Sequence, residues 1–79
     1  MNKTNIRSVL EEFIPHKNVN FEEYQDKFYL KKRIQEAIPG KPDEAIYKAI
    51  DFANEFVKPP RMRTDYINVL IKKLDAASN

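Results

Sequence analysis

The feature that most restricts the fold of this chain is the placement of its prolines. The 79 residues include five prolines and a single glycine, and Pro15, Pro39, Pro59 and Pro60 lie just after apolar stretches. Proline lacks an amide hydrogen and its ring clashes with the preceding helical turn, so a helix normally ends before it. One glycine is too few for the many tight turns of a sheet-rich fold. The pattern predicts helices separated by proline-containing connections.

Apolar spacing within these intervals supports the same fold. Apolar residues recur at every third or fourth position, which is typical of amphipathic helices. Asn20 and Thr64 are suited to cap the second and fourth helices, because their side-chain oxygens can accept a free backbone amide hydrogen. We therefore predict an all-α fold, a small bundle of four helices with short connections that contain proline. The predicted helices cover residues 4–14, 20–38, 43–58 and 64–77.

The third predicted helix has the widest uncharged face and is expected at the centre of the core. At 100° per residue its apolar side chains fall within one arc. The arc contains Ala45, Ile46, Ala49, Ile50, Phe52, Ala53, Phe56 and Val57. We expect Phe52→Ala or Phe56→Ala to cost about 3–5 kcal/mol, as for other buried aromatic side chains.

The second predicted helix has two apolar directions instead of one. Phe21, Tyr24 and Phe28 point one way, whereas Leu30 and Ile34 point another. Two interpretations remain open: the helix is buried against two neighbours, or it bends or breaks near residues 28–30.

Length and composition indicate one small domain, residues 1–79, in a reducing compartment. Chains of this size often depend on disulfides, a metal or a partner subunit for stability, and the sequence has no cysteine. The absence of cysteine favours a cytoplasmic location. No apolar run exceeds three residues, so neither a signal peptide nor a membrane span is predicted.

Residues for catalysis or metal binding are scarce. His16 is the only histidine, and Ser8 and Ser78 are the only serines. A nucleophilic site needs a hydroxyl or thiol beside a base, and a zinc site needs several histidine or cysteine ligands. We predict that the protein is not an enzyme and that it uses no cofactor and no metal.

Two basic clusters are candidates for a surface that binds nucleic acid. They occupy residues 27–33 and 58–63, although fourteen basic and twelve acidic residues leave a net charge of only +2. Basic side chains near aromatic ones can follow a phosphate backbone, but they also solvate ordinary helix surfaces. The candidate contacts to phosphate or to an acidic partner are Lys31, Lys32, Arg33, Lys58, Arg61 and Arg63. The sequence does not decide whether the two clusters form one surface, and it predicts that charge reversal at Arg61 and Arg63 leaves the fold intact.

Three residues outside the predicted apolar faces are candidates for binding a protein partner. These are Tyr29, Tyr47 and Val69. Exposed tyrosines often anchor interfaces, because the ring loses water while the hydroxyl stays solvated. The preferred hypothesis is a non-enzymatic interaction or regulatory module that binds another protein or itself, with no membrane partner. Nucleic-acid binding through the basic clusters is the alternative.

Overall fold

The computed structural model describes residues 6–14 and 19–77 as four α-helices with their connections. The helices are α1 (Ile6–Phe13), α2 (Tyr24–Ala37), α3 (Asp43–Phe56) and α4 (Arg63–Ala77). No strand occurs in the described part of the chain. The predicted all-α fold with four helices is therefore confirmed.

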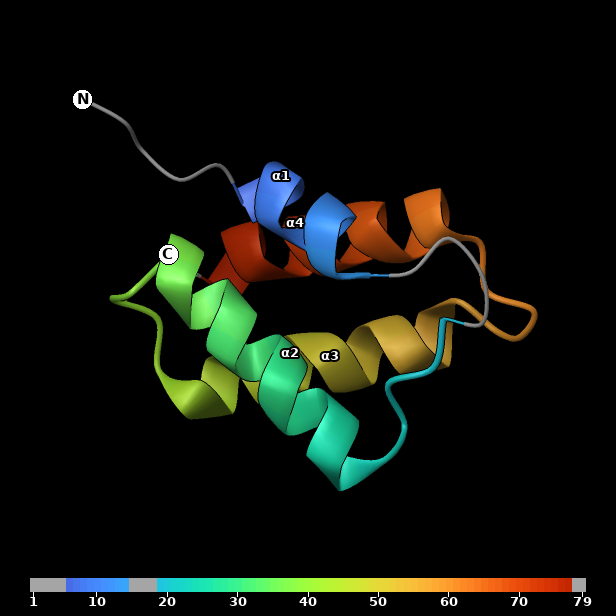
Figure 1. Cartoon of the computed structure of the whole chain (residues 1–79), viewed down its shortest axis with the longest axis horizontal. Coiled ribbons are helices and arrows are strands. Elements are labelled where there is room, and N and C mark those ends of the chain that lie inside the picture. Colours follow the sequence, from blue (N-terminus) through green and yellow to red (C-terminus); the bar gives the residue numbers. More distant parts are fainter. Residues whose placement is uncertain (1–5, 15–18, 78–79) are drawn as a thin grey trace.

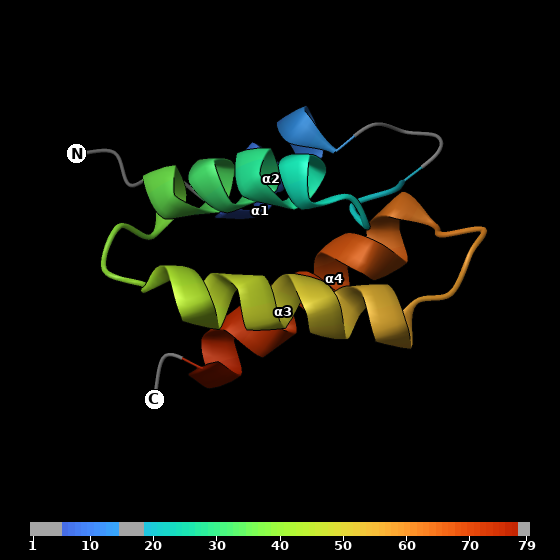
Figure 2. The same cartoon turned by 90° about the horizontal axis from the view of Figure 1, so that it is seen from below.

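The four helices form a closed ring in which each packs against two others. α1 and α3 each contact both α2 and α4, and the contact between α3 and α4 is the most extensive. Figure 1 shows that the α2–α3 and α3–α4 connections lie at opposite ends of the molecule. In Figure 2, α2 lies along α3, with α1 behind α2 and α4 behind α3. Consecutive helices thus run in opposite directions, as short connections require.

One core lies inside the ring and receives apolar side chains from every helix. The fully buried side chains include Leu10 of α1, Leu30 and Ile34 of α2, and Ile46 and Ile50 of α3. α4 adds a buried stripe that consists of Tyr66, Ile67, Leu70 and Leu74. Removal of apolar area from water is the main driving force for folding in so small a chain.

The second helix begins four residues later than predicted. Asn20 does not cap it, because the Asn20 side-chain oxygen accepts the amide hydrogen of Glu22 at 3.2 Å in a local turn. The Phe21 side chain is buried in the core, and its carbonyl accepts a hydrogen bond from the Asn54 side chain at 2.9 Å. These two interactions hold residues 20–22 outside the helix, which starts at Tyr24.

α2 is continuous through Phe28, Tyr29 and Leu30, which selects one of the two interpretations of its pattern. The helix packs against α1 on one side and α3 on the other. The helix is therefore unbroken and has two neighbours, but of its two apolar directions only that of Leu30 and Ile34 is buried, since Tyr24 and Phe28 are exposed.

The predicted core of α3 is only partly correct. Ile46, Ala49, Ile50 and Ala53 are buried, but Phe52 is 41% exposed and Phe56 is 67% exposed. α4 packs closely along this helix, and the two rings at the edge of the apolar arc project past the contact instead of entering it. The expected cost of 3–5 kcal/mol for Phe52→Ala or Phe56→Ala therefore does not apply.

The remaining helix ends differ from the predictions by one or two residues, apart from the start of the first. α3 ends at Phe56 and α2 at Ala37, and each is followed by one residue whose amide hydrogen closes the last turn. α4 begins at Arg63, one residue before the predicted cap Thr64. α1 ends at Phe13, and residues 4 and 5 of the predicted first helix lie outside the described residues.

Candidate functional site

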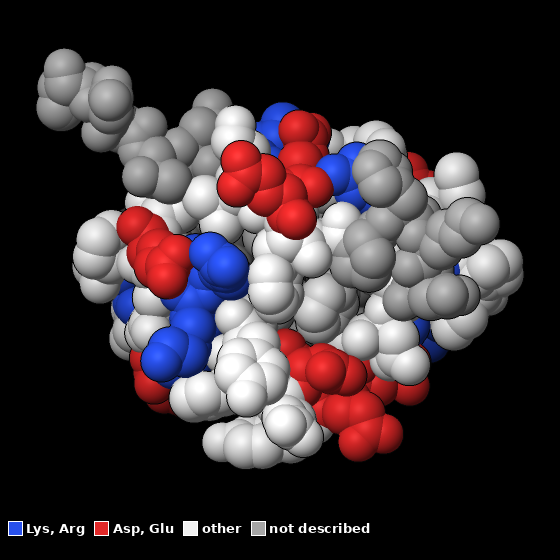
Figure 3. All heavy atoms as spheres, viewed as in Figure 1, with Lys and Arg blue, Asp and Glu red and all other residues white. Residues whose placement is uncertain are grey.

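The first basic cluster, residues 27–33, is divided between different sides of α2. Lys27 forms an ion pair with Asp51 of α3 at 2.7 Å. Lys31 is buried, 3.6 Å from Asp43 and with its ammonium 4.8 Å from the centre of the Phe28 ring. Lys32 is exposed. Figure 3 shows basic side chains over the later part of α2 next to acidic ones, and further acidic side chains over α1 and the start of α2. On this face the basic side chains form one short patch over α2 that acidic side chains border.

The second basic cluster, residues 58–63, uses both arginines to hold helix ends. The Arg61 side chain is 4% exposed, and its Nε donates to the Val57 carbonyl at 2.6 Å. Its guanidinium also donates to the Asn54 carbonyl and to Glu22, each at 2.9 Å. These bonds satisfy carbonyls at the end of α3 that have no partner within the helix.

Arg63 performs the same function for α1. Its Nε donates to the carbonyl of Ile14 at 3.0 Å, and its guanidinium also donates to the carbonyl of Glu11. A guanidinium used in this way has fewer donors left for a phosphate. Of the three predicted contacts in this cluster, Lys58 is exposed. The prediction that charge reversal at Arg61 and Arg63 leaves the fold intact conflicts with these bonds.

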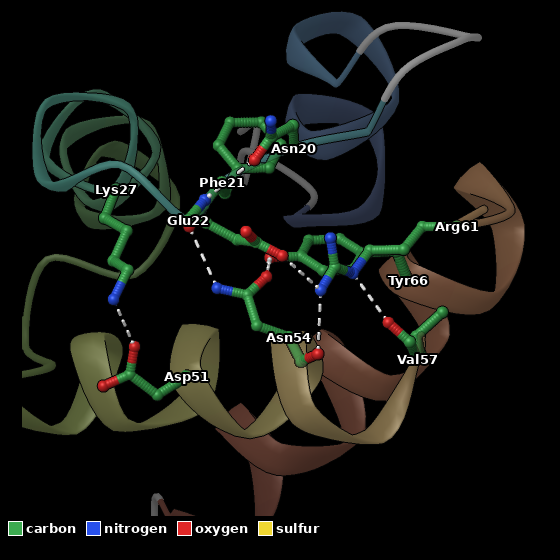
Figure 4. Close-up of polar contacts among 9 residues, drawn as sticks. All are labelled: Asn20, Phe21, Glu22, Lys27, Asp51, Asn54, Val57, Arg61 and Tyr66. Atoms are coloured by element: carbon green, nitrogen blue, oxygen red, sulfur yellow. Dashed lines mark hydrogen bonds and ion pairs between the residues drawn. The ribbon is translucent and has the colours of Figure 1, made fainter. Parts of the chain in front are cut away.

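A buried polar network lies beside Arg61 and connects three parts of the chain (Figure 4). The Tyr66 hydroxyl donates to the Asn54 side-chain oxygen at 2.7 Å, and the Asn54 side-chain nitrogen donates to the Phe21 carbonyl at 2.9 Å. The Tyr66 ring also stacks on Phe21, with ring centres 5.9 Å apart. Asn54 thus links α4 to the segment that precedes α2.

Sequence reasoning missed this network, although one signal was present. Tyr66 lies four residues before Leu70 and eight before Leu74, so it shares their helical stripe. That spacing predicts that the Tyr66 side chain is buried. Nothing in the sequence indicated Asn54 as its partner, because the two residues lie on different helices.

The buried Tyr66 hydroxyl should reduce stability at alkaline pH. Burial raises the pKa of Tyr66 above its ordinary value of 10.0, against an opposing effect of Arg61. Above pH 10 the tyrosine ionises in the unfolded chain but stays protonated in the folded one, so the unfolded state gains free energy of ionisation. Below pH 10 it is protonated in both states and has no such effect.

We expect Tyr66 to lower the free energy of unfolding by up to about 1.4 kcal/mol for each pH unit above 10. Urea titrations between pH 8 and pH 11 measure this decline. Tyr66→Phe should remove the contribution of this group and leave that of every other titrating group. If the parent and the variant lose stability in parallel, Tyr66 is not the cause.

The structure does not bring the three predicted partner-binding residues together. Tyr29 is exposed and lines a hollow between α1 and α2. Tyr47 is half-buried against the core and stacks on Tyr24, with ring centres 6.3 Å apart. Burial raises the pKa of Tyr47, and Tyr24 adds to the effect. Val69 is half-buried in a different hollow, between α3 and α4.

The hollow beside Val69 adjoins a group of exposed apolar side chains. Phe52 and Phe56 stack with ring centres 5.7 Å apart, and Met62 nearby is 64% exposed. The hollow has a volume of about 380 Å³, and its walls include Phe56, Val57, Pro60, Met62 and Val69. We call this surface the α3–α4 groove, defined by Phe52, Phe56, Met62 and Val69.

Phenylalanine and methionine have no group that keeps a hydrogen bond to water, unlike an exposed tyrosine. Single exposed apolar residues are common, but a contiguous group of them usually marks an interaction site. The α3–α4 groove is therefore our candidate site among the described residues.

Neither a metal centre nor a membrane-spanning helix is found in the described part of the chain. Among these residues, no group of three histidine, cysteine, aspartate or glutamate side chains is placed to hold a metal ion. None of the described helices is both long and apolar enough to cross a membrane. His16, the one histidine, lies outside the described residues.

Comparison with known proteins gives no further assignment. No family model, no curated protein and no solved structure matches the chain.

Proposed function

We propose that the chain is a non-enzymatic protein–protein interaction module that binds its partner through the α3–α4 groove. The observation that carries the proposal is the exposure of the stacked rings of Phe52 and Phe56 beside Met62. Aromatic residues and methionine are enriched at the centres of protein interfaces, where their burial provides most of the binding energy. A cytoplasmic location fits a chain whose sequence contains no cysteine.

Nucleic-acid binding, the alternative function, has less support. Phosphate binding requires cationic groups that are free to approach the backbone. Arg61 and Arg63 instead donate to carbonyls at helix ends, and Lys31 is buried beside Asp43. Of the six candidate contacts, Lys32, Arg33 and Lys58 are exposed, and Arg33 lies 3.5 Å from Glu36.

Photo-crosslinking in cells that express the chain tests the proposal. The photoreactive residue p-benzoylphenylalanine would replace Phe56, or Tyr24 as the matched control. Tyr24 is also an exposed aromatic residue, at 74%, but it lies at the α2–α3 contact. We expect discrete protein adducts from position 56 and few or none from position 24. Phe52→Ser, introduced together with the probe at position 56, should weaken binding about tenfold or more, because truncation of an interface aromatic commonly costs over 1.4 kcal/mol.

Two results would contradict the proposal. Equal labelling from both positions would mean that the groove has no special role. Micromolar binding to duplex or single-stranded nucleic acid that is measurable at about 50 mM salt and falls steeply by about 200 mM would favour the alternative function.

A further inference from the structure

The α3–α4 groove has a charge pattern along its two walls. We call α3 and the residues directly after it the α3 wall, and α4 the α4 wall. At one end lies the hollow beside Val69, with Lys58 on the α3 wall and Asp65 on the α4 wall. At the other end lies a second hollow of about 380 Å³, with Glu44 and Lys48 on the α3 wall and Lys73 on the α4 wall. Phe52 joins the two ends, because its ring stacks on Phe56 and lies 4.7 Å from the Lys73 ammonium.

The two walls carry opposite charges at the end of the groove beside Val69. Beside Val69, the α3 wall carries a base, Lys58, and the α4 wall carries an acid, Asp65. At the other end, the α3 wall carries an acid and a base, Glu44 and Lys48, and the α4 wall carries a base, Lys73. None of the described residues forms an ion pair with Lys58 or Asp65 within the chain.

This pattern is complementary to itself. A two-fold axis that runs along the groove places the α3 wall of one copy against the α4 wall of the other. Lys58 then faces Asp65 of the second copy, and Asp65 faces its Lys58. At the other end Lys48 lies 3.9 Å from Glu44, so the two charges offset each other and the α3 wall has no net charge opposite Lys73.

We propose that the occupant of the α3–α4 groove is the same groove of a second copy of the chain, in a two-fold symmetric homodimer. The inference rests on the proposed function and names its partner. Phe52 and Phe56 of each copy pack against Met62 and Val69 of the other. The two Lys58–Asp65 pairs set the register, and the apolar centre provides most of the affinity.

The small size of the chain is consistent with such a dimer. With a core limited to a few residues per helix, no cysteine in the sequence, and no cluster of metal-ligating side chains among the described residues, association is the remaining common way to add buried apolar area. A homodimer also covers the exposed phenylalanines without a different protein.

Sedimentation velocity of the full chain over a wide concentration range tests the dimer. We expect a reversible dimer in the micromolar range. Phe56→Ala should weaken dimerisation at least thirtyfold, because each copy loses an aromatic ring at the centre of the contact. The ring is 67% exposed within one chain, so the helical circular dichroism spectrum should not change. Tyr29→Ala, in the hollow between α1 and α2, is the control and should leave dimerisation unaltered.

Charge reversal provides a sharper test of the register. Lys58→Asp gives a copy with two acids at the end of the groove beside Val69, and Asp65→Lys gives a copy with two bases there. Each variant alone should dimerise about tenfold more weakly, since two pairs become repulsive. An equimolar mixture of the two variants should form a heterodimer with approximately the parent affinity.

The outcomes separate this inference from the proposed function. A chain that stays monomeric up to about 1 mM, with crosslinks from position 56 only to a different protein, overturns the homodimer but retains the interaction module. A dimer unaffected by Phe56→Ala overturns the assignment of this surface. A dimer that is weakened by Phe56→Ala, but whose two charge variants do not recover when mixed, overturns the proposed symmetry.

Discussion

Tyr66→Ala should lower the free energy of unfolding by about 3–5 kcal/mol, the largest effect we expect from any single substitution. The side chain is fully buried and is the largest of the fully buried ones. Its removal leaves a cavity beside Phe21, loses the stacked ring contact and leaves the Asn54 oxygen without its donor. Because small domains have a total stability of only about 5–15 kcal/mol, the variant should be largely unfolded in mild denaturant. Urea titration followed by circular dichroism measures the change.

Two further substitutions show which part of Tyr66 is responsible. Tyr66→Phe keeps the ring and removes the hydroxyl, so we expect a loss of about 1–2 kcal/mol from the unpaired Asn54 oxygen. Phe56→Ala removes a similar ring from an exposed position, and at dilutions where the chain is monomeric it should cost well under half as much as Tyr66→Ala. If Tyr66→Ala and Phe56→Ala were equally destabilising under those conditions, the assignment of one ring to the core and the other to the surface would be wrong.

Arg61→Ala should have the second largest effect, a loss of about 2–3 kcal/mol. The guanidinium is almost fully buried and donates to Val57, Asn54 and Glu22. Removing it leaves two carbonyls at the end of α3 without a donor, in a place with little access to water. Thermal and urea unfolding of the variant measure the loss.

Two control substitutions distinguish the hydrogen bonds of Arg61 from its charge. Arg33→Ala removes an exposed ion pair with Glu36 and should cost less than about 1 kcal/mol. Arg61→Lys retains the charge but not the fork of donors, so it should recover only part of the stability. A change at Arg61 no larger than that at Arg33 would show that the helix-end bonds contribute little.

Local features of the sequence determined the number of helices and most of their ends. Proline acts on the turn directly before it, so the ends of α2 and α3 near Pro39 and Pro59 were within one or two residues of the prediction. Apolar periodicity likewise identified the buried positions Ile46, Ala49 and Ile50, because the direction of a helix face depends only on the spacing of its residues.

The start of α2 was predicted incorrectly because a tertiary interaction overrode a local preference. Asn20 is a favourable cap in isolation. In the structure, burial of Phe21 and its hydrogen bond to Asn54 hold this segment against the core and away from the helix. A sequence read along one helix carries no information about a partner 33 residues away.

The sequence alone determined that this chain forms four amphipathic helices and where most of them end, since both depend on neighbouring residues. Only the tertiary structure decided how wide a part of each helix face is buried and where the long side chains end. Close packing of α4 on α3 leaves Phe52 and Phe56 at the surface, and Arg61 and Arg63 reach carbonyls of other segments instead of solvent. The candidate groove exists for that physical reason: the direction of a helix face is a local property, whereas its coverage depends on how closely its neighbours approach.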